Sequence, residues 1–393
     1  MDMDAERPIA DLEPALHRTF QCRCGRPVFF RNTQCLNCGS ELGFDPVIGD
    51  IVTLDPGNEA GTWLAADKAC AGRPYKRCAN AGTAAACNWL LPQDAAVMPH
   101  GPDGQPLVHR SLCVACAVNR TIPDLADPAH AEQWGKIELA KRRLVSALLA
   151  MGLPFRSKLD EDPAQGVVFD FLAELPGEPR VLTGHDDGLI TLNIAEADDA
   201  VREKTRAAMH EPYRTLLGHL RHEIGHYYWD RLVAGSSWLE PFRALFGDER
   251  ADYGQALQRY YEQGAPADWP LHCISAYATM HPWEDWAETW AHYLHINDTI
   301  ATANDFGLAL AQTEDYQPFG PDVLYRADVP DARGFLDAIN DWVRLTGVMN
   351  ELARSMGVND LYPFVMSAEV VRKLHFIHLA VADGRQTAGI AVV

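Results

Sequence analysis

The sequence lacks any hydrophobic run long enough to cross a membrane. A spanning helix needs about 18 or more consecutive apolar residues, and the longest candidate, residues 144–153, is shorter and follows three basic residues. We interpret it as the buried face of an amphipathic helix. The first twenty residues are acidic and have no apolar core, so they do not have the pattern of a secretory signal. These absences predict a cytoplasmic protein with no membrane partner.

Positive charge is also scarce. The chain has 34 Lys and Arg residues against 54 Asp and Glu residues, for a formal net charge of −20. Nucleic acids and anionic membranes attract basic surfaces, so we do not expect either as a partner. An apolar share of 47% and a charged share of 22% are typical of globular proteins. The 393 residues predict two domains or three.

Cysteine is nearly absent after residue 116, because nine of the ten cysteines lie at or before that position. In a reducing compartment, such crowding indicates metal binding rather than disulfides. Two short pairs, each ending in Cys-Gly, come first in the chain. Their members are Cys22, Cys24, Cys35 and Cys38. Four thiolates fill the coordination shell of a tetrahedral zinc ion, which leaves no position for a substrate. The first predicted zinc site is therefore structural.

A second structural zinc site is predicted from a looser set of cysteines. Its preferred members are Cys78, Cys87, Cys113 and Cys116. Only the last two have the close spacing typical of zinc ligands, and Cys70 competes for one position. The alternative is that some of these residues are buried apolar cysteines. In the preferred reading Cys70 and Cys273 are free thiols.

Composition and periodicity divide the chain near residue 125. Residues 45–123 are rich in Gly, Ala and Pro, and small turn-rich segments need a staple such as zinc. We therefore expect residues 1–125 to form a zinc module and residues 126–393 to form a mostly helical domain with a small sheet. The fold class of the whole chain is α+β. Helical periodicity covers residues 132–151, 212–233, 241–246, 249–263, 283–295, 330–345 and 368–382.

Two strands are predicted before the helix at residues 212–233. They cover residues 167–172 and 189–194, with a turn at residues 184–188. The second is either an edge strand that pairs with an extended peptide substrate or an ordinary core strand. The sequence does not separate these two alternatives.

The motif His222-Glu223-Ile224-Gly225-His226 lies inside the helix predicted at residues 212–233. Residues four apart share one face of a helix, so both imidazoles can bind one zinc ion. Glu223 would then stand beside the open position of the metal, where it can take a proton from a zinc-bound water. This arrangement predicts a catalytic zinc ion in addition to the two structural ones.

The third ligand of the catalytic zinc is expected to be a carboxylate. A metzincin would have a histidine six residues after His226, where this chain has Leu232. The preferred candidate is Glu284, which shares a predicted helix face with Glu288. One of the two can bind zinc while the other hydrogen-bonds a zinc-bound histidine. The alternatives are Glu249 and Glu288 itself.

Two further residues are candidates for supporting roles. Tyr277 lies seven residues before Glu284, and its phenol could donate a hydrogen bond to the oxyanion formed when water attacks a peptide carbonyl. The alternative is a packed aromatic side chain. His219 lies one turn before His222 and either supports the site or is an ordinary helix residue.

These residues resemble a bacterial family of zinc-binding metallopeptidases with an N-terminal zinc-ribbon domain. The resemblance is carried by residues 211–230, 190–199, 246–253 and 275–295, and by the stretches around the second set of cysteines. It implies a zincin fold of the gluzincin type, with a glutamate as third ligand and a cytoplasmic setting. The spacing of Tyr277, Glu284 and Glu288 is similar to that of anthrax lethal factor, which implies Glu284 as ligand and Tyr277 as oxyanion donor.

The sequence thus predicts a zinc-dependent peptidase that acts on a peptide or protein. Glu223 would be its general base, and its substrate range would be narrow, because a general protease would harm the cytoplasm. A rival hypothesis is a zinc-ribbon module that binds protein or nucleic acid and carries an inactive peptidase-like body. The acidic composition and the intact motif both count against that rival.

Overall fold

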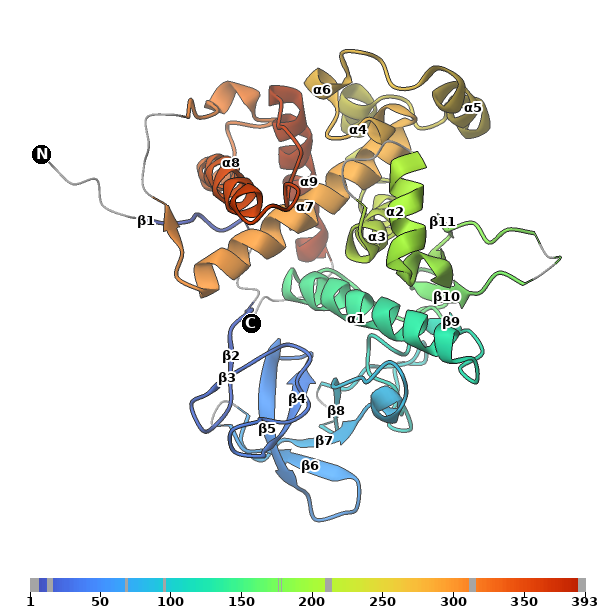
Figure 1. Ribbon diagram of the computed structural model, residues 1–393, viewed down its shortest axis with the longest axis vertical. Coiled ribbons are helices and arrows are strands. Elements are labelled where there is room, and N and C mark those ends of the chain that lie inside the picture. The colour runs from blue at the N-terminus through green and yellow to red at the C-terminus, as the bar shows by residue number, and fades with distance from the viewer. Residues whose placement is uncertain are drawn as a thin grey trace, which may run out of the picture. The chain divides into compact units, whose positions relative to one another are not determined.

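The computed structural model describes residues 7–12, 17–67, 70–94, 97–175, 177, 179–208, 214–310 and 316–387. The chain forms two compact units. We call Leu16–Met209 the cysteine-rich unit, and Met1–Ala15 together with His210–Val393 the helical unit. Figure 1 labels their helices and most of their strands. Helices and several sheets occur together, so the α+β class predicted from the sequence is confirmed.

The cysteine-rich unit begins with short antiparallel strands. The hairpin β2 (Phe20–Gln21) and β3 (Pro27–Val28) is followed by a five-stranded antiparallel sheet in the order β4-β5-β6-β7-β8. Those five strands are Glu41–Asp45, Asp50–Pro56, Thr62–Ala65, Pro74–Arg77 and Leu90–Pro92. Residues 45–123 therefore contain more regular structure than their composition predicts.

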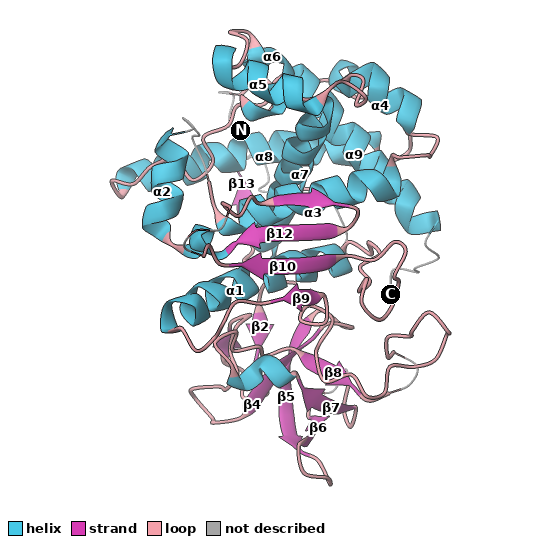
Figure 2. Cartoon of the chain, turned by 90° about the vertical axis from the view of Figure 1, so that its right-hand side faces the viewer, coloured by secondary structure: helices cyan, strands magenta, loops and turns pink. Residues whose placement is uncertain are grey.

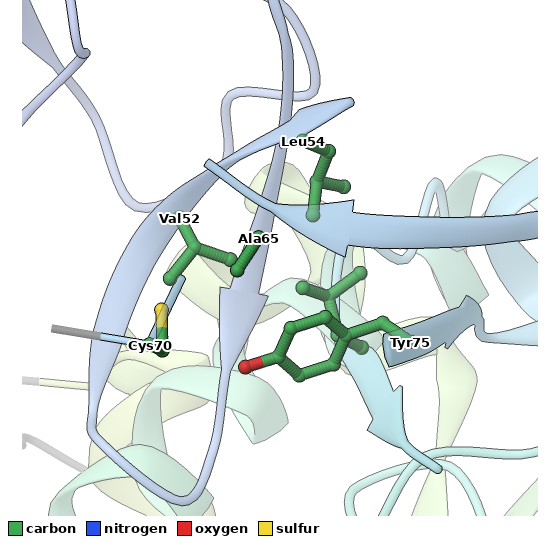
Figure 3. Packing of buried hydrophobic residues seen from close by; sticks show 6 residues of the cluster. Val52, Leu54, Ala65, Cys70 and Tyr75 are labelled. Atoms are coloured by element: carbon green, nitrogen blue, oxygen red, sulfur yellow. The ribbon is translucent and has the colours of Figure 1, made fainter. Parts of the chain in front are cut away.

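A small apolar core holds this sheet together. Its buried members are Val52, Leu54, Ala65, Cys70, Tyr75 and Leu90. Figure 3 shows Cys70 among these side chains, next to Val52. Burial raises the pKa of its thiol. Cys70 is therefore a core thiol, and it is not a member of either cysteine cluster described below.

The second half of the cysteine-rich unit contains a four-stranded sheet in the order β11-β12-β10-β9 (Figure 2). The strands are β9 (Asn119–Thr121), β10 (Val168–Leu172), β11 (Gly184–Asp186) and β12 (Leu189–Asn193), with the helices α1 (Pro128–Ala150) and α2 (Asp199–Ala208) and the 3-10 turn η2 (Ile194–Ala197). The 3-10 turn η1 (Ala79–Gly82) comes earlier, between β7 and β8. The strand β12 lies between β10 and β11, so it is not an edge strand. The two edge strands are β9 and β11, and the sequence predicted only a turn in the segment of β11.

The helical unit consists mainly of seven helices within the described residues: α3 (Leu216–Leu232), α4 (Leu239–Phe246), α5 (Tyr253–Gln263), α6 (Trp269–His272), α7 (Pro282–Asp305), α8 (Ala332–Ser355) and α9 (Ala368–Thr387). The 3-10 turns η3 (Tyr277–Thr279) and η4 (Pro321–Val323) and the strand pair β1 (Arg7–Pro8) and β13 (Ala309–Leu310) complete it. None of the described helices combines the length and apolarity that a membrane crossing requires.

The helix predicted at residues 249–263 begins four residues later than expected. The carboxylate of Asp252 accepts a hydrogen bond from the backbone N–H of Gln255, so Asp252 caps α5. Asp248 pairs with Arg250 and Glu249 pairs with Arg243 in the loop before it. A side chain that satisfies exposed backbone N–H groups fixes where a helix starts, and periodicity alone does not reveal it.

Candidate metal centre

The helix α3 presents His222 and His226 on one buried face. Its first turn is capped by Thr215, whose hydroxyl oxygen accepts from the backbone N–H of Gly218. Both imidazoles lie one helical turn apart and are less than a tenth exposed. Their Nε2 atoms are 3.2 Å apart. The four-residue spacing therefore brings two ligand atoms to one point, as the sequence predicted.

Gly225, between the two histidines, allows α7 to approach this face. A Cβ atom at this position would lie 3.1 Å from Cα of Ala287 and 3.1 Å from Cδ1 of Trp290. The indole of Trp286 donates a hydrogen bond to the carbonyl oxygen of Gly225 over 2.8 Å. A side chain of α7 is thus hydrogen-bonded to the backbone of α3 between the two histidines.

The helix α7 places a third potential ligand atom beside the two histidines from its first turn. His281 caps the helix by accepting from the backbone N–H of Trp283, and Pro282 occupies the first helical position. Glu284 therefore lies in the first turn, where the helix dipole favours negative charge. Its Oε2 atom lies 3.0 Å from Nε2 of His222. Within the described part of the chain, His222, His226 and Glu284 form one group of converging ligand atoms.

The separations of these atoms fit a zinc ion. Zinc–nitrogen and zinc–oxygen bonds of about 2.0–2.1 Å in a tetrahedron place neighbouring ligand atoms about 3.3 Å apart. The observed separations are 3.2 Å and 3.0 Å. Oε2 of Glu284 is buried and accepts no hydrogen bond within the described residues. A buried carboxylate oxygen that faces an imidazole nitrogen without a hydrogen bond is accounted for by a cation between the two groups.

Glu288, one turn after Glu284, orients His222 rather than joining the ligand group. Its Oε1 atom lies 2.7 Å from Nδ1 of His222, and its Oε2 atom accepts from the hydroxyl of Ser275 over 2.6 Å. Since a carboxylate can only accept, Nδ1 carries the proton and a neutral His222 has its lone pair on Nε2. This is the form of imidazole that binds metal.

The competing candidate Glu249 lies outside the ligand group. Both of its oxygens accept from the guanidinium of Arg243, and this pairing lowers the pKa of the carboxyl group. Among the described residues, Glu249 is not a member of any converging metal-ligand group. The geometry therefore favours Glu284 as the third ligand.

Glu223 stands beside the ligand group without belonging to it. Its carboxylate pairs with Nε2 of His219 over 3.1 Å. Burial raises the pKa of Glu223, but the His219 hydrogen bond and the nearby imidazoles outweigh burial and lower it overall. Glu223 is thus held as a carboxylate, the form that a general base requires. His219, which the sequence left undecided, contacts the candidate base directly.

Two tyrosines also lie close to the group. The ring of Tyr277 is centred 6.1 Å from that of His222. The hydroxyl of Tyr253 donates to Oε1 of Glu284 over 3.0 Å. Burial and then the charge of Glu284 raise the pKa of both phenols, which keeps them protonated and able to donate.

The sequence did not single out Tyr253 or Ser275 as members of the site. Both lie in stretches that carry the family resemblance, at residues 246–253 and 275–295, and each touches a carboxylate of α7. The signal was present in those stretches, but the partners are 31 and 13 residues away in sequence. Periodicity within one helix therefore cannot reveal them.

The first cysteine cluster has the dimensions of a four-thiolate zinc site. Cys22 and Cys38 lie 3.6 Å apart, and Cys24 and Cys35 lie 3.7 Å apart. Zinc–sulfur bonds of about 2.3 Å in a tetrahedron give about 3.75 Å. The side-chain amide of Asn37 donates to Sγ of Cys24. Cys24 and Cys38 are exposed and the other two are buried.

The second cluster has the same dimensions but is wholly buried. Sγ of Cys87 lies 3.7 Å from that of Cys113 and 3.8 Å from that of Cys116, and the backbone N–H of Cys113 donates to Sγ of Cys78. All four cysteines converge as one group. None of the ten cysteines, all within the described residues, forms a disulfide.

Charged residues of α1 lie against the second cluster. Oε2 of Glu138 lies 3.7 Å from Sγ of Cys116, and its Oε1 accepts from Lys141 over 2.6 Å. Arg142 donates to the carbonyl oxygen of Ala85. The helix α1 belongs to the same compact unit as the cysteines, and this unit ends at Met209. The domain boundary expected from the sequence lies near residue 125.

Comparison with known proteins gives matches over most of the chain. Residues 130–380 match the model of a family described as "Putative zinc-binding metallo-peptidase", and residues 19–127 match that of a zinc-ribbon domain. Uncharacterized proteins of Mycobacterium bovis and of two Mycobacterium tuberculosis strains are each 42% identical over 369 residues. The alignments cover 93% of this chain and 96% of each relative. No solved structure matches the chain.

Proposed function

The chain belongs to this family of zinc-binding metallopeptidases with an N-terminal zinc-ribbon domain, and we propose on that basis that it hydrolyses peptide bonds. The observation that carries the proposal is the convergence of one ligand atom each from His222, His226 and Glu284, with Glu223 beside them. Three protein ligands leave a fourth position open for water or substrate, as in catalytic zinc sites. Zinc held there would act as a Lewis acid and lower the pKa of water toward neutrality.

Glu223 is the general base of the proposed reaction. Its carboxylate takes a proton from the attacking water and then delivers that proton to the amine that leaves. His219 holds one carboxylate oxygen at 3.1 Å, which limits rotation of the side chain. A base that is fixed near the reacting water avoids the entropic cost of finding it.

Tyr277 is the proposed donor to the developing oxyanion. Its phenol stays protonated at neutral pH and lies beside His222. A hydrogen bond that is made only as negative charge develops on the carbonyl oxygen lowers the barrier selectively. Glu288 and Ser275 contribute indirectly, by fixing the tautomer and the ring orientation of His222.

The two cysteine clusters are proposed as structural zinc sites, which makes one catalytic and two structural ions in total. Four thiolates leave no open coordination position. The buried second cluster also adjoins Glu138 and Lys141, so its ion would help to hold α1 in place. We further propose a cytoplasmic setting, in which free thiolates persist, and a substrate that is a specific peptide or protein.

The decisive experiment counts metal ions. Elemental analysis of the wild type should give three zinc ions per chain, and the His222→Ala/His226→Ala variant should give two. A peptide-library screen should then show cleavage by the wild type and none by the variant. Two ions in both proteins would contradict the catalytic site, and cleavage of casein-like substrates would contradict narrow specificity.

A further inference from the structure

The hydroxyl of Tyr253 donates a hydrogen bond to Oε1 of Glu284, the oxygen that is turned away from His222. From this contact we infer that Tyr253 is a positioning residue of the metal centre, which fixes the carboxylate of Glu284 so that only Oε2 faces the metal. The inference rests on the proposed metal site and adds a residue from α5 to it.

The geometry separates the two oxygens of Glu284 by role. Oε2 lies 3.0 Å from Nε2 of His222 and accepts no hydrogen bond among the described residues. Oε1 lies 3.5 Å from Nε2 of His226 and accepts from Tyr253 over 3.0 Å. A carboxylate that is free to rotate can exchange its oxygens or bind through both. A donor fixed on one oxygen removes that freedom and keeps the other in the ligand position.

Packing alone does not explain the position of the Tyr253 side chain. The residue is 39% exposed, so packing fixes its side chain only in part. Its ring contacts His281, which caps α7, at a centroid distance of 5.4 Å. The hydroxyl is the part of the side chain that reaches the buried carboxylate.

The test compares zinc affinities of conservative variants. Tyr253→Phe removes the donor and keeps the ring. Tyr261→Phe is the matched control, because Tyr261 lies on the same helix, is 64% exposed and makes no hydrogen bond within the described residues. Tyr277→Phe is a second control, because it removes the neighbouring phenol but leaves the bond to Glu284. Affinity is measured by competition of the third zinc ion with a chromophoric chelator, using the His222→Ala/His226→Ala variant as baseline.

We expect Tyr253→Phe to weaken zinc binding about 10-fold or more, the usual effect of losing a hydrogen bond to a metal ligand. Tyr261→Phe and Tyr277→Phe should bind zinc within about 3-fold of the wild type, a smaller change than such a loss. The visible spectrum of the cobalt-loaded protein should change in Tyr253→Phe alone of the three. Equal zinc affinity and an unchanged cobalt spectrum in Tyr253→Phe would overturn the inference while leaving the metal site intact. A wild type with only two zinc ions would instead overturn the site and the inference together.

Discussion

Nδ1 of His222, on α3, lies 2.7 Å from Oε1 of Glu288, on α7. The contact fixes which imidazole nitrogen points toward Glu284. For the proposed zinc ion, Glu288 would therefore raise metal affinity without binding the metal itself, because a carboxylate partner increases the basicity of the ligand nitrogen.

Replacing Glu288 by Ala should therefore weaken zinc binding at this site about 10- to 100-fold. The hydroxyl of Ser275 would lose its acceptor as well. The measurement is chelator competition on the purified protein. Glu351→Ala is a suitable control, since Glu351 is an exposed carboxylate on α8. Equal losses in the two variants would show that Glu288 acts through overall charge and not through His222.

Replacing Glu223 by Gln should separate chemistry from metal binding. The variant keeps the size and most of the hydrogen-bonding capacity of the side chain but cannot accept a proton. Removing a general base costs about 10²- to 10⁴-fold in rate, whereas zinc content should remain at three ions per chain. The rate is measured on a peptide selected by the library screen. A variant that loses zinc together with activity would show that Glu223 is a ligand and not a base.

The ligand group was largely predictable because its signals are local in sequence. His222 and His226 are four residues apart on one helix, as are Glu284 and Glu288, and helical spacing alone places each pair on one face. The cysteine pairs are likewise recognisable from spacing. Spacing alone could not decide whether Glu284 or Glu288 lies among the histidine nitrogens. The packing of α7 against Gly225 places Glu284 there.

The rest depended on contacts between distant segments. Tyr253 reaches Glu284 from another helix, and Glu138 reaches Cys116 from α1. The sheet β4–β8 was missed because its strands are short and lie mostly in a region rich in Gly, Ala and Pro. Its strands are held together by mutual pairing and by the core around Tyr75, and strand propensity of this kind depends strongly on context.

Gly225→Ala should destabilise the helical unit. The added methyl group would lie 3.1 Å from Cα of Ala287, a backbone atom that cannot move aside cheaply. Overpacking of this kind typically costs about 1–3 kcal/mol, against a gain of up to about 1 kcal/mol from replacing a helical glycine. Chemical denaturation followed by tryptophan fluorescence measures the difference. Gly254→Ala on α5, where a Cβ would contact only Asp252 at 3.5 Å, should be neutral or stabilising. A Gly225→Ala variant as stable as the wild type would mean that α3 and α7 separate without cost.

The last prediction concerns pH and rests on His375 in α9. Its Nδ1 atom accepts from the backbone N–H of Arg326, and its ring packs on Phe335 at 4.7 Å. Burial lowers the pKa of this imidazole to about 4. The unfolded chain binds a proton near pH 6.5, while the folded chain binds it only near pH 4. Protonation of His375 in the unfolded chain therefore does not lower the free energy of unfolding above pH 6.5. Its effect grows as the pH falls and levels off below pH 4.

His375→Leu should remove this part of the acid sensitivity. Between pH 6.5 and 4 the free energy of unfolding of the wild type should fall by up to about 1.4 kcal/mol per pH unit from this group, and the variant should show a shallower slope whatever its stability at pH 7. Denaturant titrations at several pH values measure both slopes on the same protein preparations. Parallel slopes would mean that His375 is protonated in the folded state. The buried site would then have to supply an acceptor for its Nδ1 proton in place of the donor at Arg326 that it now faces.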